Sequence, residues 1–217
     1  MGPLPTRRID AGELLQHVSR VVYRGEPLHY GRDGMNRFDA ADNSYGVLYL
    51  GLSLPTALME SVFHEHRWDR DEKRSISLAE VHSRLVRAIG VLEDLELADL
   101  TAPGVMAAHF GLNLEQLASR GYQHTQRISG ELHAMRGADG LPAFDGVLYP
   151  SRNNYPEPGV ALFDRLAQHD VDQLVAVSVL ADVGAAVDGA RGLGDGLAAH
   201  AQRACLLLVD VQAKHLH

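Results

Sequence analysis

Cysteine is nearly absent from the 217-residue chain, which contains only Cys205. One cysteine cannot close an internal disulfide, and Cys205 stands in an apolar run that is typical of a buried thiol. Long hydrophobic runs are also missing, since no stretch reaches the roughly 18 apolar residues of a membrane-spanning helix. Residues 1–17 lack the apolar centre of a secretory signal. We therefore expect a protein of the reducing cytoplasm that does not enter membranes.

Positive charge is the scarcer sign in this chain. It has 20 Lys and Arg residues against 28 Asp and Glu residues, for a net charge of −8. The basic residues are dispersed, and the densest group, residues 67–74, carries its own acidic residues. Because nucleic-acid binding depends on a positively charged surface, direct binding of nucleic acid is not expected.

Two patterns that would indicate a familiar site fail on their spacing. Residues 189–196 read GARGLGDG, with glycines two apart, whereas a dinucleotide fingerprint requires G-x-G-x-x-G between strand and helix. His64 and His66 flank Glu65, whereas the zinc motif H-E-x-x-H places its two histidines on one helix face. No metal and no resident cofactor are therefore expected, although the chain contains 12 histidines.

A hydrophobic content of 46% supports one large core, and no linker rich in Pro, Gly or Ser divides the chain. We expect a single domain over residues 1–217. Strands, then helices, then strands again favour an α+β fold over regular β-α-β winding. Residues 26–44 are polar and predict a long loop. Strands are predicted at residues 17–25, 45–51, 75–80, 85–92, 144–149, 160–163, 173–180 and 205–211, and helices at residues 55–66, 113–120 and 124–136.

The segment VLYLGLSLPTALMES, residues 47–61, contains one residue that packing does not explain. It predicts a strand, a short turn and a helix capped by Ser53 or Thr56. At roughly 100° per residue, Glu60 lies about 200° around the helix from Leu58. Glu60 therefore points away from the apolar stripe to which Leu58 belongs.

Four other polar residues stand at element ends or in loops. Arg24 ends the first predicted strand, Arg37 lies in the long loop, and Tyr49 lies on the strand that precedes Glu60. Ser151 follows a proline that ends a strand. Each has an ordinary structural explanation when taken alone: a surface ion pair, packing on a half-buried strand, or turn chemistry.

Taken together, the strings VVYRG, NRFDA, VLYLGLSLPTALMES and FDGVLYPSRNNYPEPGVALFD resemble the RES domain. This domain is the toxin half of bacterial RES–Xre toxin–antitoxin pairs. The similarity extends over about residues 21–163, and the spacing YLG…PTALxE is fairly specific. The first 20 residues and those after about 164 match no motif, and the strands predicted within residues 173–211 are expected to complete the fold. Arg24, Tyr49, Glu60 and Ser151 occur in the order that the family shows.

The resemblance implies a fold similar to the ADP-ribosyltransferase core, with two small sheets flanked by helices and an NAD cleft between the sheets. It implies a toxin that consumes NAD by cleaving the nicotinamide–ribose bond, through hydrolysis or phosphorolysis. It further implies a cognate Xre-type helix-turn-helix antitoxin that plugs the active site in the bacterial cytoplasm. A homodimer within the toxin–antitoxin complex is consistent with this picture.

The resemblance also assigns roles to residues. Glu60 would oppose the positive charge of an oxocarbenium-like transition state. Arg24 and Arg37 would bind the pyrophosphate, and Tyr49 would offer its ring to nicotinamide. Ser151 would either contact nicotinamide or ribose, or hold Glu60 and Arg24 in place. The expected catalytic set is Glu60, Arg24, Tyr49 and Ser151, and the expected NAD-binding set is Arg24, Arg37, Tyr49 and Ser151.

Two alternatives stay open at this point. The protein can be an ADP-ribosyltransferase that modifies a cellular protein, with Ser53 or Glu65 near the catalytic glutamate to activate the acceptor. It can also be an inactive partner-binding domain, with the apolar C-terminal strands as its interface.

Overall fold

A computed structural model describes residues 2–62, 78–113, 115–116, 119, 121–165 and 174–182. Several features predicted from sequence lie outside these residues: residues 64–66, the charged run 67–74, the glycine-rich run 189–196 and the last predicted strand, 205–211. The described elements are β1 (Thr6–Ile9), β2 (Leu14–Arg20), η1 (Val21–Tyr23), β3 (Val47–Gly51), α1 (Leu54–Met59), α2 (Leu78–His82), β4 (Arg84–Val91), β5 (Leu95–Asp99), α3 (Val105–Phe110), α5 (Gln123–Ala134), β6 (Gly146–Pro150), β7 (Pro158–Phe163) and β8 (Leu174–Asp182).

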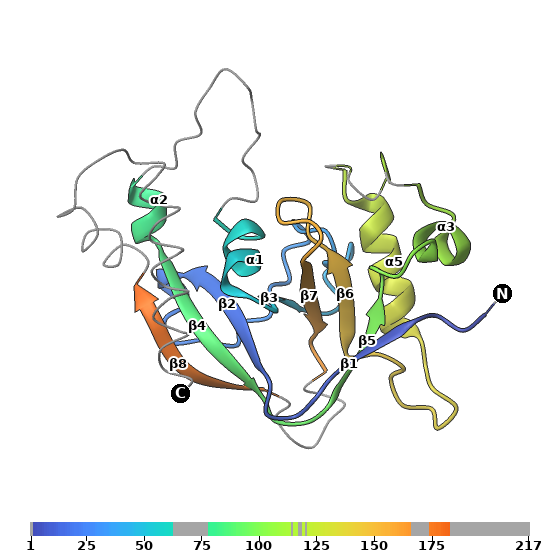
Figure 1. Cartoon of the computed structure of the whole chain (residues 1–217), viewed down its shortest axis with the longest axis horizontal. Helices are drawn as coiled ribbons and strands as arrows, with labels where there is room; N and C mark the ends of the chain where they lie inside the picture. The colour runs from blue at the N-terminus through green and yellow to red at the C-terminus, as the bar shows by residue number, and fades with distance from the viewer. Residues whose placement is uncertain are drawn as a thin grey trace.

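The eight described strands form one mixed sheet in the order β1-β5-β6-β7-β3-β2-β4-β8. All neighbouring strands are antiparallel except β5 and β6, which are parallel. Figure 1 shows α1 beside the middle of the sheet, with α3 and α5 gathered at its β5–β6 end. The α+β class predicted from sequence is confirmed.

The sheet is narrowest between β2 and β3. These strands pair at one position only, Gln16 with Gly51, whereas β2 pairs with β4 along its whole length and β3 does the same with β7. The expectation of two separate small sheets is therefore wrong for the hydrogen-bonded order. The pair Gln16–Gly51 joins the two parts into one continuous sheet. Beyond this pair, β2 and β3 separate.

Apolar side chains cover both faces of the sheet around β3. Val47 belongs to a core cluster with Phe38, Ile128 and Phe163, whereas Leu48 belongs to a cluster on the other face. A strand that is buried on both faces reads as a nearly continuous apolar run, as VLYLG does. This is why the sequence predicts β3 clearly.

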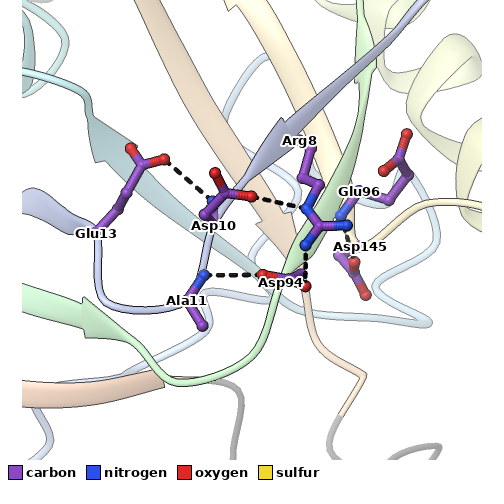
Figure 2. Close-up of polar contacts among 7 residues, drawn as sticks. All are labelled: Arg8, Asp10, Ala11, Glu13, Asp94, Glu96 and Asp145. Carbon is purple, nitrogen blue, oxygen red and sulfur yellow. Dashed lines mark hydrogen bonds and ion pairs between the residues drawn. The ribbon is translucent and has the colours of Figure 1, made fainter.

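The first edge of the sheet is held by a polar network (Figure 2). Arg8 on β1 pairs with Asp10 and with Asp94, and the Ala11 amide donates to Asp94 Oδ1 at 2.9 Å. The Asp145 carboxylate accepts from the Glu96 amide at 2.8 Å. These bonds tie the turn between β1 and β2 to the β4–β5 turn, which brings the N-terminal residues into the sheet. The sequence predicted no strand there.

Several element boundaries differ from the sequence prediction. The first predicted strand ends at Arg20, because Val21–Tyr23 form the short helix η1. The carbonyl oxygens of Tyr23 and Arg24 at its end accept hydrogen bonds from the buried Arg87 guanidinium. The predicted strand 75–80 is wrong in its described part, since Leu78–His82 form α2, in keeping with the helix propensity of Leu, Ala and Glu. The sequence did not predict β1, β5 and α3, because their apolar residues follow no distinctive helical or strand periodicity. β5 is stabilised by burial within the sheet.

Other predictions are confirmed. Ser53 is the N-cap of α1 and accepts from the Thr56 amide at 3.4 Å, although α1 ends at Met59. At the start of the helix predicted at residues 113–120, Asn113 and Gln116 exchange the reciprocal side-chain bonds of a capping box. The helix predicted at residues 124–136 is α5, and the strand predicted at residues 173–180 is β8. Among the described segments, no helix is both long and apolar enough to cross a bilayer.

Candidate functional site

A cavity of about 930 Å³ opens where β2 and β3 separate. Counting on from the pair Gln16–Gly51, the rest of β2 would face the rest of β3, and residues of both strands line the cavity. The long loop after η1, the end of α1 and Tyr149 complete its wall. The narrow junction of the sheet is therefore the base of a cleft.

Glu60 stands at the end of α1 and lines this cavity. Its Oε1 accepts a hydrogen bond from the Ser151 hydroxyl at 2.6 Å and from the Arg152 amide at 3.2 Å. Both donors come from the loop between β6 and β7. The carboxylate is therefore held from a second element, which restricts its rotation and orients it at the cavity wall.

The same loop also clamps the helix that carries Glu60. The Asn153 side chain donates to the Met59 carbonyl at 3.2 Å, and the Asn154 side chain donates to Thr56 Oγ1 at 2.9 Å. The Asn154 amide closes the loop by donating to Ser151 Oγ at 3.0 Å. The motif SRNN thus acts as a unit that positions the last turn of α1.

These bonds bear on the role of Ser151, for which the sequence left two alternatives. Ser151 is 2% exposed and is not among the residues that line the cavity. Its hydroxyl donates to Glu60 and accepts from Asn154. The geometry therefore favours a positioning role for Ser151 over direct contact with a ligand. The residue that it is seen to hold is Glu60.

Tyr49 lies on β3, lines the cavity and anchors the loop that carries Arg37. Its hydroxyl donates to Asp39 Oδ1 at 2.9 Å and accepts from the Phe38 amide at 2.9 Å. Burial, followed by the nearby negative charge of Asp39, raises the pKa of Tyr49 well above its usual value. Tyr49 therefore stays a neutral phenol whose hydroxyl is already engaged.

Arg37 lies in the cavity wall and is only 3% exposed. Its guanidinium carbon lies 5.1 Å from the centre of the Tyr149 ring and 5.4 Å from that of Phe38. Burial lowers the pKa of Arg37, and the charge of Glu60 acts in the opposite direction. An arginine keeps its charge under such a shift, so a cation is fixed near the Glu60 carboxylate.

Tyr149 is a site residue that the sequence analysis assigned only to a strand. It lines the cavity, and burial, together with the charge of Glu60 and a hydrogen bond to it, raises the pKa of Tyr149 well above its usual value. The ring lies against Gly159 on β7, where a Cβ atom would come within 2.6 Å of Tyr149 Cζ. The position of Tyr149 directly before Pro150 and Ser151 was the sequence feature that could have indicated its place in the site.

Arg24 does not reach the cavity. It is exposed at the end of η1 and is not among the lining residues. The buried Arg87 donates to the carbonyl oxygens of Tyr23 and Arg24, at 3.1 and 3.0 Å. The structure thus brings Glu60, Tyr49, Arg37 and, through its bond to Glu60, Ser151 together, and leaves Arg24 outside.

Four guanidinium groups gather in the lining of the cavity. Its lining includes Arg20, Arg32, Arg37 and Arg84, against the carboxylates of Asp33 and Glu60. Arg32 pairs with Asp164, and both Arg84 and Arg20 pair with Glu80. In a chain with a net charge of −8, this concentration of guanidinium groups fits an anionic ligand. The sequence did not reveal it, because these arginines lie far apart along the chain.

A search of curated proteins finds no match. Among solved structures, a chain of the crystal structure of the M. tuberculosis MbcT–MbcA toxin–antitoxin complex is similar, with a TM-score of 0.55 and 16% sequence identity. The similarity covers 79% of this chain and 84% of that chain, and at this identity it shows a shared fold. The sequence profile of the RES domain matches residues 14–182, which include every strand of the sheet except β1. The chain belongs to the RES domain family.

Proposed function

We propose that this protein is the toxin of a toxin–antitoxin pair and that it consumes NAD by cleaving the nicotinamide–ribose bond. The carrying observation is the Glu60 carboxylate, held by Ser151 and the Arg152 amide at the wall of a cavity rich in arginine. Membership of the RES family and the fold shared with a chain of a toxin–antitoxin complex support the proposal.

The chemistry asks little of the protein besides charge and orientation. Nicotinamide leaves the ribose as a neutral molecule, so the leaving group needs no general acid. The ribose then develops positive charge, as in glycoside hydrolysis. Glu60 stabilises that charge electrostatically and accepts a hydrogen bond from a ribose hydroxyl. Because Ser151 and Arg152 already orient the carboxylate, little reorganisation is needed when the charge appears.

The arginines account for the rest of the substrate. The pyrophosphate of NAD carries two negative charges, and a guanidinium binds phosphate oxygens through a planar fork of N–H donors. Arg37 is fixed by its aromatic neighbours, and Arg32 and Arg84 lie in the same lining. Arg24, which we expected to bind the pyrophosphate, does not line the cavity, so we assign this role to Arg37 and its neighbours.

The acceptor of ADP-ribose is water, phosphate or a protein. The transferase alternative assigned acceptor activation to Ser53 or Glu65. Ser53 is the N-cap of α1 and bonds Thr56, while Glu65 lies outside the described residues. We propose consumption of NAD as the main activity, and transfer to a protein is tested alongside it.

An antitoxin is the proposed protein partner. Tyr23 and Met35 line the cavity and are 37% and 71% exposed, which places apolar surface at the cavity. A helix-turn-helix protein of the Xre type that covers this surface would exclude NAD. Purified antitoxin should therefore inhibit NAD consumption in proportion to the complex formed.

The proposal is tested by incubating purified protein with NAD, with and without phosphate, and measuring free nicotinamide and ADP-ribose products. Radiolabelled NAD added to a cell lysate tests transfer to a protein. Glu60→Gln should abolish nicotinamide release while the thermal unfolding temperature stays near that of the wild type. Glu131→Gln, which removes an exposed carboxylate paired with Arg127 on α5, is the matched control and should keep full activity. Full turnover by Glu60→Gln, or no nicotinamide release and no label transfer by the wild type, would contradict the proposal.

A further inference from the structure

His17 stands at the point where the sheet opens. In the register that Gln16 and Gly51 set, Val18 would face Tyr49, but no backbone pair forms there. Instead, Nδ1 of the His17 imidazole lies 2.9 Å from the Tyr49 carbonyl oxygen. A side chain thus replaces a bond of the strand ladder, and the space beyond it belongs to the cavity, which His17 lines.

This bond settles the tautomer of the ring. A carbonyl oxygen only accepts, so Nδ1 carries the proton and Nε2 carries the lone pair. In the part of the chain that the structure describes, Nδ1 makes the only hydrogen bond of this imidazole. The side chain is 8% exposed, and burial lowers the pKa of His17 to about 4. His17 is therefore a neutral acceptor at physiological pH.

We propose that His17 determines the specificity of this cavity, by accepting through Nε2 a hydrogen bond from a hydroxyl or amide N–H of the ligand. The inference rests on the proposed function, since NAD carries such donors on its riboses and its carboxamide.

The arginines of the cavity cannot accept such a hydrogen bond. The lining arginines only donate, and so they recognise phosphate oxygens. The neutral lone pair of His17 accepts a hydrogen bond from a hydroxyl or an N–H group, but it cannot donate one to a phosphate oxygen. The two kinds of group therefore orient an anionic dinucleotide, with its phosphates at the arginines and a neutral donor at His17.

Two substitutions separate this role from the structural one. In His17→Asn, the amide Nδ2 takes the place of Nδ1 and still donates to Tyr49, but the acceptor at Nε2 is lost. Its unfolding temperature should stay near the wild-type value, while NAD binds roughly five- to tenfold more weakly, as expected for one hydrogen bond. His17→Phe removes both bonds and should lose stability as well as affinity. Affinity is measured by calorimetry in the Glu60→Gln background, so that NAD is not consumed, and His109→Asn on α3 is the control.

A ¹⁵N NMR spectrum of the imidazoles detects the proposed hydrogen bond to His17 Nε2 directly. The Nε2 resonance of His17, identified by its absence from His17→Asn, should shift when NAD is added, whereas that of His109 should not. Nicotinamide alone tests the carboxamide as donor, and ADP-ribose tests the hydroxyls; a shift with either supports the inference. If NAD binds but the resonance does not move and His17→Asn binds as tightly as its background, the inference is overturned while the proposed function stands. If none of the three probes binds, the proposed function fails and this assignment fails with it.

Discussion

Glu60 shows how one side chain acquires a role from its neighbours. The same carboxylate on an isolated helix end would rotate freely in water. Here the Ser151 hydroxyl and the Arg152 amide both donate to its Oε1, and the Arg37 guanidinium interacts electrostatically with the carboxylate. Preorganised groups of this kind stabilise a developing charge without reorganising during the reaction.

The first prediction concerns the serine that holds this carboxylate. Ser151→Ala removes the donor to Glu60 and the acceptor for the Asn154 amide. A charge-assisted hydrogen bond contributes about 1.5–3 kcal/mol, so nicotinamide release should fall roughly tenfold or more. Steady-state kinetics measure the loss, and denaturant unfolding reports the accompanying change in stability.

Ser129→Ala is the matched control for that variant. Ser129 is a fully buried serine that bonds Tyr45 and the Phe38 carbonyl, and it does not line the cavity. The control should lose stability by a similar amount and keep its activity per folded molecule. Equal activity losses in both variants would refute the positioning role of Ser151.

A second prediction concerns the buried cation of the cavity. Arg37→Lys keeps the charge but removes the planar fork that lies over Tyr149 and Phe38. The KM for NAD should rise roughly tenfold or more, as for a lost charge-assisted bond, while kcat changes less. Arg127→Lys on the exposed face of α5 should leave both constants unchanged. A lower kcat at constant KM would place Arg37 at the reacting bond instead of at the pyrophosphate.

At the scale of elements, the junction of β3 and α1 sets the distance between Tyr49 and Glu60. Gly51 ends β3, and Ser53 caps α1 two residues later. A Cβ atom at Gly51 would lie 2.6 Å from the Ala57 amide nitrogen and 2.7 Å from the Ser53 carbonyl oxygen. Only glycine allows the helix to start this close to the strand.

The third prediction follows from that contact. Gly51→Ala should force strand and helix apart and lower the free energy of unfolding by about 2 kcal/mol or more, within the range for overpacking. Gly130→Ala in the middle of α5 provides the opposite control, because its Cβ meets nothing within 4 Å. That variant should gain about 0.5–1 kcal/mol through helix propensity. Urea unfolding measures both, and a stable, fully active Gly51→Ala would show that the junction tolerates movement.

At the scale of the whole molecule, two histidines are folded in their neutral form. Burial lowers the pKa of His17 and of His133 to about 4. The His133 ring stacks on Tyr45 with the ring centres 3.8 Å apart, and the His17 ring bonds the Tyr49 carbonyl oxygen. In the unfolded chain, each would titrate near 6.5.

The fourth prediction is the pH dependence that results. Between pH 6.5 and 4 the unfolded chain binds more protons than the folded one, so stability falls as the pH is lowered through this window and levels off below it. One pKa unit corresponds to about 1.4 kcal/mol, which gives an effect on the order of 3 kcal/mol for His17 and less for the more accessible His133. Urea unfolding from pH 7.5 to 4.5 measures the slope. The pair of substitutions His17→Asn and His133→Gln should flatten it, and an unchanged slope would refute the assignment.

The sequence was informative wherever a segment's own pattern decides its structure. β3, β4 and α5 follow from apolar runs and helical periodicity, and the cap at Ser53 follows from a local side-chain bond. β1 and β5 escaped prediction because their neighbours stabilise them, with Arg8 and Asp94 holding one end. Strand order cannot be read from local pattern, so the joined sheet was also missed.

For the site, the sequence by itself predicted that Glu60 turns away from the apolar stripe that includes Leu58. Through its resemblance to the RES domain, it also selected Arg24, Tyr49, Glu60 and Ser151. Only the tertiary structure decided which residues meet. It brought Ser151 to Glu60 across 91 positions, placed Arg37, Tyr149 and His17 in the cavity and left Arg24 outside it. The physical reason is that helix and strand periods arise from neighbours along the chain, whereas a cavity arises from where separate strands part.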